Sequence, residues 1–437
     1  MKKDIRRLFF KYTIPGVVGM MVTSLYVVVD GIFIGKAVGS DGLAAVNMVE
    51  AVIAFSFALN IMIATGSATI VAIKMGEKKL HEASKIFSFF VLTLILVAGG
   101  VSFFILTFPE QTAIFLGATG TLKNMVIEYM TMIMYFNIFF MGTYFLEIFV
   151  RTNGRPTYSM SALIIGGVLN IILDYIFIIQ FDYGLKGAAL ATGISQTVAT
   201  LILIVDFFRS DSQLKFVKPD FSFSLLLRGI FNGSSEFVSE LSLGFIIFIF
   251  NLIIMREIGK IGVSAFSIIN YVNTVVFALL LGVSQGIQPI ISYSLGANER
   301  YVIRGILALA MKTVFIIGSI AFTSMFIFSE DIIRTFSTND ELLVFTSKAA
   351  KIYCFAYFLN GINMVMAAYF TAIENAKLSA FISALRGIIF VFIGVTVFPM
   401  IWGVEGIWFT MPVAEVLTTI IGYRFIKKCK ILKLYSL

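Results

Sequence analysis

The chain is a series of long apolar runs separated by short polar segments. A helix of about 20 residues crosses the roughly 30 Å of hydrocarbon in a bilayer, and each run is about that long or longer. Twelve spans are predicted, at residues 12–36, 48–73, 86–107, 124–149, 158–180, 187–208, 229–254, 263–293, 305–328, 345–372, 380–400 and 407–425. The predicted fold class is therefore an all-α integral membrane protein.

The composition supports a membrane protein and excludes several other classes. The chain is 59% hydrophobic and 13% charged, with a mean hydropathy of +0.96, and soluble proteins do not have this composition. The formal charge of +8 comes from residues between the apolar runs, so we expect no nucleic-acid partner. Cys354, Cys429 and the single histidine, His81, are too few and too scattered in the sequence for a disulfide framework or an ordinary zinc site.

Basic residues predict the orientation of the spans. One alternating set of connections, which includes both ends of the chain, holds about 23 Lys and Arg residues. The opposite set holds only Lys36, Lys123, Lys186, Arg256, Lys260 and Arg334. By the positive-inside rule, both termini lie in the cytoplasm and the protein is a multi-pass protein of the cell inner (cytoplasmic) membrane. We expect the first span to act as its own insertion signal, without a removable signal peptide.

The two halves of the chain repeat each other. A shift of 220 residues aligns Gly39 with Gly259 and Gly66 with Gly286. This predicts an N-terminal six-helix lobe at 1–210, a cytoplasmic linker at 211–228 and a C-terminal six-helix lobe at 229–437. Six spans per lobe give both the same orientation, so a pseudo-two-fold axis runs along the membrane normal, as in transporters that alternate access by rocking two bundles.

Two aspartates lie inside apolar spans, where a charge costs about 2.5–3.5 kcal/mol on insertion scales. These are Asp30 in the first span and Asp174 in the fifth, and Asn170 shares a helix face with Asp174. The order of the spans places them, with Thr192, in the outer half of one lobe. The four residues predict an oxygen-rich site for Na⁺ or for a proton. In the alternative reading, each acid pairs with a buried cation.

The chain resembles the multidrug and toxic compound extrusion (MATE) transporters over essentially its whole length. The resemblance rests on Pro15-x14-Asp30, Asn170-x3-Asp174, Gly187-Ala-Ala-Leu-Ala-Thr192 and Arg151-Thr-Asn-Gly-Arg-Pro156. It implies antiport, in which Na⁺ or H⁺ enters while a bulky, often cationic drug leaves. It also maps the family's N-lobe cation site onto Asp30, Asn170, Asp174 and Thr192. By the same resemblance, the first helix bends at Pro15 when Asp30 changes charge; alternatively, Pro15 only marks the first turns of the helix.

Three further residues are candidates for substrate binding. Tyr26 lies one turn before Asp30, and Gln196 lies one turn after Thr192. Glu240 follows Glu236 by one turn in span 7, and it either attracts a cationic substrate or pairs with a lysine such as Lys312. Three charged residues near cytoplasmic ends of spans are expected to form loop-anchoring ion pairs: Glu147, Glu374 and Arg386.

The predicted function is a cation-coupled antiporter that exports drugs or toxic organic compounds by alternating access. We expect no enzyme activity and no cofactor, because neither a nucleophile–base pair nor a nucleotide motif is found. The expected partners are small-molecule drugs and the lipid bilayer, and the expected state is a monomer. The alternative is a flippase for a lipid-linked precursor from the same wider superfamily, which requires a cleft rich in cations.

Overall fold

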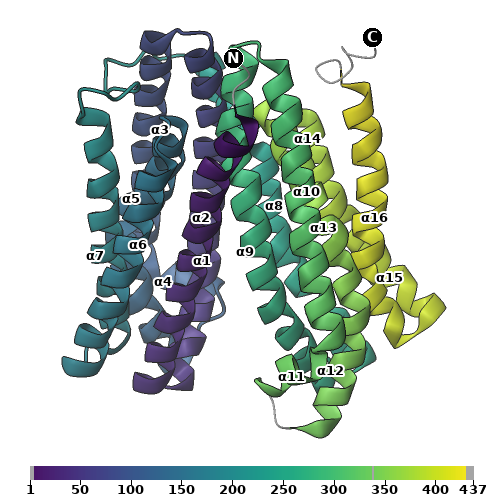
Figure 1. The fold of residues 1–437 in the computed structure, drawn as a ribbon. Coiled ribbons are helices and arrows are strands. Elements are labelled where there is room, and N and C mark those ends of the chain that lie inside the picture. Colours follow the sequence, from purple (N-terminus) through teal and green to yellow (C-terminus); the bar gives the residue numbers. More distant parts are fainter. Residues whose placement is uncertain (1–3, 337–338, 430–437) are drawn as a thin grey trace. The chain divides into compact units, whose positions relative to one another are not determined.

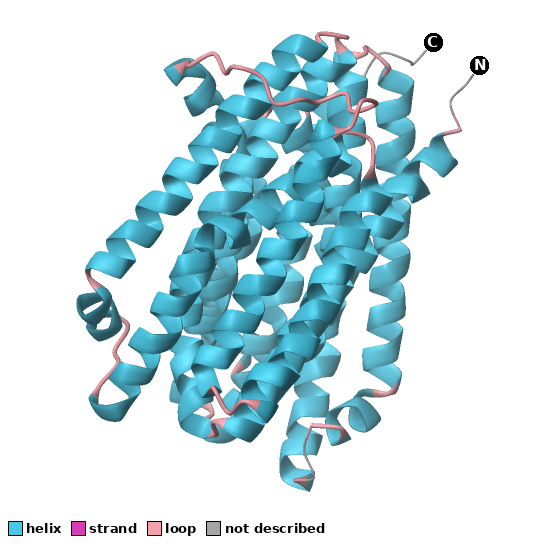
Figure 2. Ribbon diagram, turned by 90° about the vertical axis from the view of Figure 1, so that its left-hand side faces the viewer, coloured by secondary structure: helices cyan, strands magenta, loops and turns pink. Residues whose placement is uncertain are grey.

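A computed structural model describes residues 4–336 and 339–429, and every regular element within those ranges is a helix (Figures 1 and 2). Twelve helical segments are long and apolar enough to cross a membrane, which confirms the predicted all-α membrane fold. Four lysines that count toward the predicted cytoplasmic charge lie outside the described residues: Lys2, Lys3, Lys430 and Lys433.

The first half of the chain holds six spans and several short helices. In chain order they are α1 (Ile5–Ala37), α2 (Ser40–Gly76), α3 (Leu80–Thr107), α4 (Pro109–Phe115), α5 (Gly120–Thr152), α6 (Pro156–Asp174), the π-helical turn η1 (Tyr175–Gln180), α7 (Gly184–Val205) and the 3₁₀ turn η2 (Asp206–Phe208). The helices extend beyond the apolar runs, because polar residues at a helix end can keep helical geometry outside the hydrocarbon.

The second half follows the same plan. Its elements are α8 (Phe223–Glu257), α9 (Lys260–Gly296), α10 (Arg300–Ile327), α11 (Ser329–Arg334), α12 (Asp340–Tyr353), the 3₁₀ turn η3 (Cys354–Ala356), α13 (Tyr357–Ala372), α14 (Ala376–Ala384), the π-helical turn η4 (Leu385–Ile389), α15 (Phe390–Trp402) and α16 (Val404–Lys428). The spans predicted at 345–372 and 380–400 are therefore each interrupted by a turn of different helical pitch.

The predicted repeat is visible in the helix boundaries. Helix α2 begins at residue 40 and α9 at residue 260, an offset of 220, and both contain 37 residues. Each is preceded by a glycine with positive φ, Gly39 at 83° and Gly259 at 87°. Glycine adopts this conformation without the steric penalty of a Cβ atom, so the two halves start these helices by the same device.

Contacts along the chain define two compact units. The N unit comprises Val18–Gly233, and the C unit comprises Ser234–Leu437 together with Met1–Val17. Helices α1 and α8 thus each contribute one end to one unit and the remainder to the other. The predicted lobes follow chain order, and their boundaries stay a prediction.

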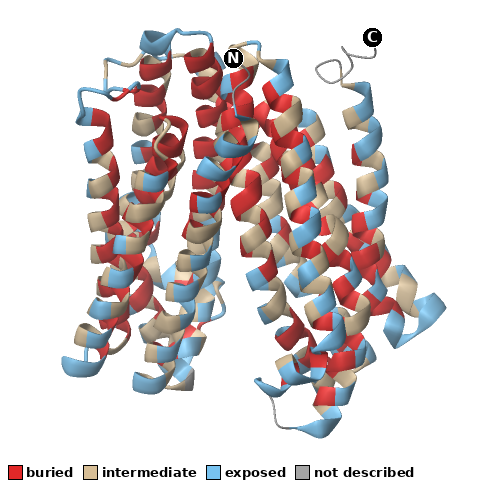
Figure 3. Ribbon diagram, viewed as in Figure 1, coloured by how far each residue is buried: buried red, intermediate tan, exposed pale blue. Residues whose placement is uncertain are grey.

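Within the N unit, α5 is the central helix and contacts α2, α3, α6 and α7. Its buried side chains include Phe145 and Phe149, which pack with Phe87 of α3 in an aromatic cluster. Buried positions gather on the helix sides that face other helices, and exposed positions occupy the outer sides (Figure 3).

The C unit is built around one large apolar cluster. Phe250 of α8, Tyr357 of α13 and Trp408 of α16 are among its buried members. The first turns of α1 join the same cluster through Phe9. This segment approaches α9 closely, because Gly282 leaves room for the α1 backbone where a Cβ atom would collide with it.

The polar segment between α7 and α8, residues 209–222, has little regular structure but is fixed along the N unit. The backbone N–H of Lys215 donates to Oγ of Ser84 at 3.2 Å, and that of Val217 donates to Oγ of Ser88 at 3.0 Å. Both serines lie on α3. Part of the predicted linker therefore lies along a helix of the first half of the chain.

Candidate functional site

A buried acid, Asp174, is the last residue of α6 in the N unit. Its side chain is fully buried, and neither carboxylate oxygen has a hydrogen-bond partner. The π-helical turn η1 begins directly after it. Such turns are frequent at functional sites, because they interrupt the regular i→i−4 ladder and re-aim the neighbouring side chains.

Asn170 and Thr192 lie together, as predicted. Asn170 is buried one turn before Asp174, and its Nδ2 donates to Oγ1 of Thr192 on α7 at 3.4 Å. The Oδ1 atom of Asn170 has no partner. The side-chain amide thus joins α6 to α7 and leaves its carbonyl oxygen beside the acidic end of α6.

Asp30 of α1 contributes the second carboxylate. Its Oδ1 atom is buried without a hydrogen-bond partner, and Asp30 and Asp174 are close enough for their charges to interact. Glu50 of α2 acts on Asp30 in the same way. No ion pair to Lys or Arg is found for either aspartate within the described part of the chain, so the alternative of a buried cation partner is not supported.

The predicted lining residues of the N unit also meet. Nε2 of Gln196 on α7 donates to the hydroxyl of Tyr26 on α1 at 3.4 Å, and Oε1 of Gln196 has no partner. Asp174 has two further oxygens without a hydrogen-bond donor, and Asp30 and Asn170 have one each, so five buried oxygen atoms in this region lack a donor. Buried oxygens of this kind normally have a hydrogen bond or a cation, so the set can accept a proton, water or a hard cation.

The ligand types exclude a conventional transition-metal centre in this region. Among residues 4–336 and 339–429, no three His, Cys, Asp or Glu side chains group together as metal ligands. The available atoms are carboxylate, amide and hydroxyl oxygens, which suit hard cations.

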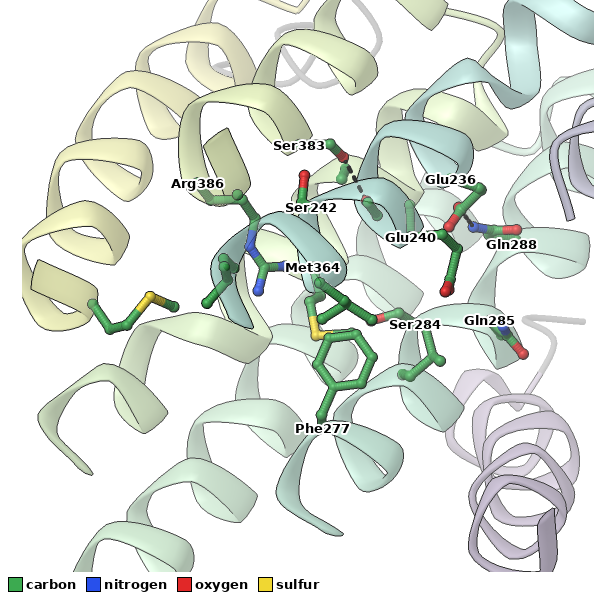
Figure 4. A pocket seen from close by; sticks show the side chains of 18 residues that line it. Glu236, Glu240, Ser242, Phe277, Ser284, Gln285, Gln288, Met364, Ser383 and Arg386 are labelled. Carbon is green, nitrogen blue, oxygen red and sulfur yellow. Dashed lines mark hydrogen bonds between the residues drawn. The ribbon is translucent and has the colours of Figure 1, made fainter. Parts of the chain in front are cut away.

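In the C unit, Glu236 and Glu240 line a cavity (Figure 4). Nε2 of Gln288 on α9 donates to Oε1 of Glu236 at 3.0 Å. Glu240 makes no hydrogen bond or ion pair with any described residue, so the alternative pairing with Lys312 is not observed.

The C unit does not repeat the acid at position 30. The residue at the offset of 220 is Phe250, which is fully buried and stacks on Phe266 with the ring centroids 5.0 Å apart. An apolar core thus occupies the equivalent place on α8. The acid of α1 therefore has no counterpart at the equivalent position of the C unit.

Pro15 lies inside α1, where it is buried within the C unit. Asp30 lies on the same helix but within the N unit. The helix therefore carries the candidate bending residue and the candidate coupling acid in different compact units.

The MatE family model matches residues 15–176 and 236–396, one match in each half of the chain. The chain belongs to the MatE family. Members of this family are transporters and not enzymes, in agreement with the prediction.

Similar proteins agree with this membership. The chain is 24% identical over 422 residues to the multidrug export protein MepA of Staphylococcus aureus (strain MSSA476), covering 95% of this chain and 92% of that protein. A MOP superfamily transporter of Pyrococcus furiosus superposes with a TM-score of 0.91 at 21% identity, covering 98% of this chain and 96% of that chain. The Vibrio cholerae MATE transporter VcmN gives a TM-score of 0.91 at 19% identity, covering 98% of each chain. These structures share the fold.

The structure places two charged residues of this MatE family member in surroundings that the sequence analysis did not predict. Glu50 lies in the field of Asp30, and Arg386, expected at a loop, lines the cavity of the C unit. Glu147 does form the expected ion pair, with Arg151. The charge of Glu50 inside an apolar helix was a usable signal, whereas the position of Arg386 depends on the turn η4.

Proposed function

We propose that the protein is a cation-coupled antiporter that exports organic compounds by alternating access, with H⁺ or Na⁺ entering as the compound leaves. The observation that carries this proposal is the group of unpartnered, buried oxygens on α1, α6 and α7. A buried carboxylate without a partner is costly, and a bound proton or cation relieves that cost. Family membership and the export function in the names of the MepA relatives support a transport role.

The proposed coupling site consists of Asp30, Asn170, Asp174 and Thr192. Two carboxylates close to each other repel. A bound proton or Na⁺ therefore stabilises the conformation in which Asp30 and Asp174 lie close together. If the exported compound binds better to the other conformation, the two ligands oppose each other through a coupling free energy. This opposition converts cation entry into compound export. Both H⁺ and Na⁺ suit the ligand set.

The proposed substrate contacts are Tyr26 and Gln196 in the N unit and Glu240 in the C unit. A carboxylate such as Glu240 attracts cationic compounds, and the tyrosine ring offers an aromatic face. We further propose that α1 bends at Pro15 when Asp30 changes charge, because a proline leaves one helical hydrogen bond unmade. The proposed setting is a monomer in the inner membrane with both termini in the cytoplasm.

The test is transport of rhodamine 123, a fluorescent organic cation, in proteoliposomes with an imposed pH or Na⁺ gradient. With one of the two ion gradients, the wild-type protein should move the dye across the membrane in the direction opposite to the downhill flow of that ion. Asp30→Asn and Asp174→Asn should each reduce this transport at least tenfold, because the site then loses the charge that responds to the cation.

Asp182→Asn is the matched control for these variants. Asp182 follows η1 on an exposed loop with φ of 53°, a conformation that asparagine tolerates well. Its transport should equal that of the wild type. Wild-type rates in both aspartate variants, with all proteins equally stable, would contradict the proposal. Transport of a lipid-linked precursor without any dye movement would favour the alternative, a flippase.

A further inference from the structure

The cavity of the C unit carries charges of both signs. It lies among α8, α9, α13, α14 with η4, and α16. Glu236 and Glu240 stand on one side of it, and Arg386 stands on the other (Figure 4). A cavity that selected only cations would not need a guanidinium group in its wall, because that group repels them.

A buried network holds Arg386 in place. Its Nη2 atom donates to Oδ1 of Asn360 at 2.8 Å and to Oε1 of Glu415 at 3.2 Å. Glu415 is fully buried, and its Oε2 accepts from Nδ2 of Asn363 at 2.6 Å. The guanidinium therefore has a fixed orientation, and its position on the π-helical turn η4 directs it to the cavity.

Arg386 retains unused donors. The hydrogen bonds of its side chain to described residues all come from Nη2, which leaves Nε and Nη1 without a protein acceptor. The side chain is 14% exposed, on the cavity. An arginine needed only to neutralise Glu415 would be expected to pair through more than one nitrogen.

The opposite wall has one fixed and one unpartnered carboxylate. Gln288 holds Glu236 by the hydrogen bond described above, whereas Glu240, one turn further along α8, has no partner among the described residues. Gln285 adds a buried Oε1 atom without a donor. This wall can therefore accept hydrogen bonds from a cationic group or compensate its charge.

An apolar surface connects the two walls. Phe277 and Met364 line the space between Glu240 and Arg386 (Figure 4), and Leu281 is a further apolar residue of the cavity lining. The cavity has a volume of ≈ 60 Å³ in this conformation, which is room for a few water molecules. An organic ligand must displace side chains to enter, and the flexible Met364 and Met411 can move at low cost.

We propose that Arg386 is a specificity-determining residue of this cavity and binds the carboxylate of amphoteric organic molecules, which carry a cationic group and a carboxylate on one apolar frame. The cationic group lies at Glu240, the carboxylate accepts from Nη1 of Arg386, and the frame packs on Phe277 and Met364. This proposal rests on the proposed export function and assigns the residue that decides its preference between cationic and amphoteric compounds. Two opposite charges satisfied at once give the amphoteric molecule an advantage over a simple cation, which leaves Nη1 of Arg386 without an acceptor.

The test compares two dyes that differ only at the carboxyl group. Rhodamine 110 has a free carboxylate and a cationic ring system, and rhodamine 123 is its methyl ester. Binding to the purified full-length protein is measured by fluorescence polarisation without an ion gradient. A hydrogen bond to a charged group corresponds to roughly 10–100-fold in affinity, so rhodamine 110 should bind at least tenfold more tightly than rhodamine 123.

Arg386 cannot be removed alone without leaving the carboxylate of Glu415 buried and unpaired. The informative variant is therefore Arg386→Gln with Glu415→Gln, which removes both charges, and its ratio of the two affinities should fall to about one. Glu415→Gln alone keeps the guanidinium and should keep the preference. Glu240→Gln should weaken both dyes about tenfold.

Arg256→Gln is the matched control, because it removes a positive charge from an exposed end of α8 outside the cavity. Its affinity ratio should equal that of the wild type. Equal binding of the two dyes to the wild type, or an unchanged preference in the double variant, would overturn the proposal. Neither result would test cation-coupled transport through Asp30 and Asp174, because binding is measured without an ion gradient. Loss of gradient-driven transport with the preference intact would instead count against the coupling mechanism.

Discussion

Nδ2 of Asn153 donates a hydrogen bond to Oδ2 of Asp206 at 2.7 Å, although 53 residues separate the two. The same nitrogen donates to Oγ of Ser212 at 2.9 Å, and Oδ1 of Asn153 accepts from the backbone N–H groups of Gln213 and Leu214 at 3.2 and 3.1 Å. One buried side chain in the loop between α5 and α6 thus fixes the start of the segment that leads to α8.

Asn153→Ala should release this segment. Two backbone donors and the carboxylate of Asp206 lose their partner, and a buried unsatisfied group costs about 1–3 kcal/mol. The variant should unfold at lower temperature, and trypsin should cleave faster after Lys215. Asn124→Ala, at an exposed site of α5, is the control and should leave both measurements unchanged. Equal cleavage rates in the two variants would show that Asn153 does not anchor the segment.

Protonation of Asp211 at low pH should remove part of the stabilisation of the same segment. Nη2 of Arg155 lies 2.6 Å from Oδ2 of Asp211, and this hydrogen bond holds the pKa of the carboxyl below its ordinary value of 3.8. Since the folded-state pKa is lowered, the stabilisation is present above the ordinary pKa and is lost as the pH falls through the lowered value.

The stability difference between wild type and Asp211→Asn should therefore be constant from about pH 5 to 7 and disappear at lower pH. Thermal unfolding at a series of pH values measures this difference. Because the side chain of Asp211 is 63% exposed, added salt should reduce the difference at neutral pH as well. A difference that grows as the pH falls would have the wrong sign.

Helices α2 and α8 approach each other closely at glycines, where Gly66 of α2 lies against the backbone of Gly229 and Gly233 of α8. A Cβ atom on Gly66 would overlap the carbonyl oxygen of Gly229 and lie 2.7 Å from the backbone nitrogen of Gly233. Because backbone atoms cannot move aside singly, Gly66→Ala should destabilise the protein by about 1–3 kcal/mol or more. Gly99→Ala is the control, since nothing lies within 4 Å of its added Cβ atom. Similar melting temperatures for both variants would mean that this close approach does not exist.

Glu147 and Arg151 form an ion pair at the end of α5, with each side chain only 4% exposed. Oγ of Ser159 also donates to Oε1 of Glu147 at 3.1 Å. Glu147→Met leaves a buried guanidinium unpaired and should cost about 3–5 kcal/mol, whereas Glu147→Met with Arg151→Met should cost much less.

A more exposed pair provides the comparison for this prediction. Lys123 and Glu110 lie 2.9 Å apart with side chains that are 28% and 67% exposed. Lys123→Met should cost less than about 1 kcal/mol. Chemical unfolding of the purified variants gives these differences. A double variant at Glu147 and Arg151 that is as unstable as the single variant would mean that the pair does more than neutralise charge.

The sequence by itself determined the number of spans and the internal repeat. The length of an apolar run must match the thickness of the hydrocarbon, so each span could be counted without knowing its neighbours. The offset of 220 residues aligned Gly39 with Gly259, and in the structure these two glycines directly precede α2 and α9. Helical periodicity likewise placed Asn170 and Asp174 on one face, because 3.6 residues per turn is a local property of the chain.

Only the tertiary structure decided which helices bring their polar residues together. It placed Gln196 against Tyr26, Glu50 in the field of Asp30, and Arg386 across a cavity from Glu240. These relations depend on packing between helices far apart in the chain and on the π-helical turn η4, which changes the direction of the side chains that follow. Periodicity within one helix carries no information about its neighbours, so these contacts could not be read from the sequence pattern.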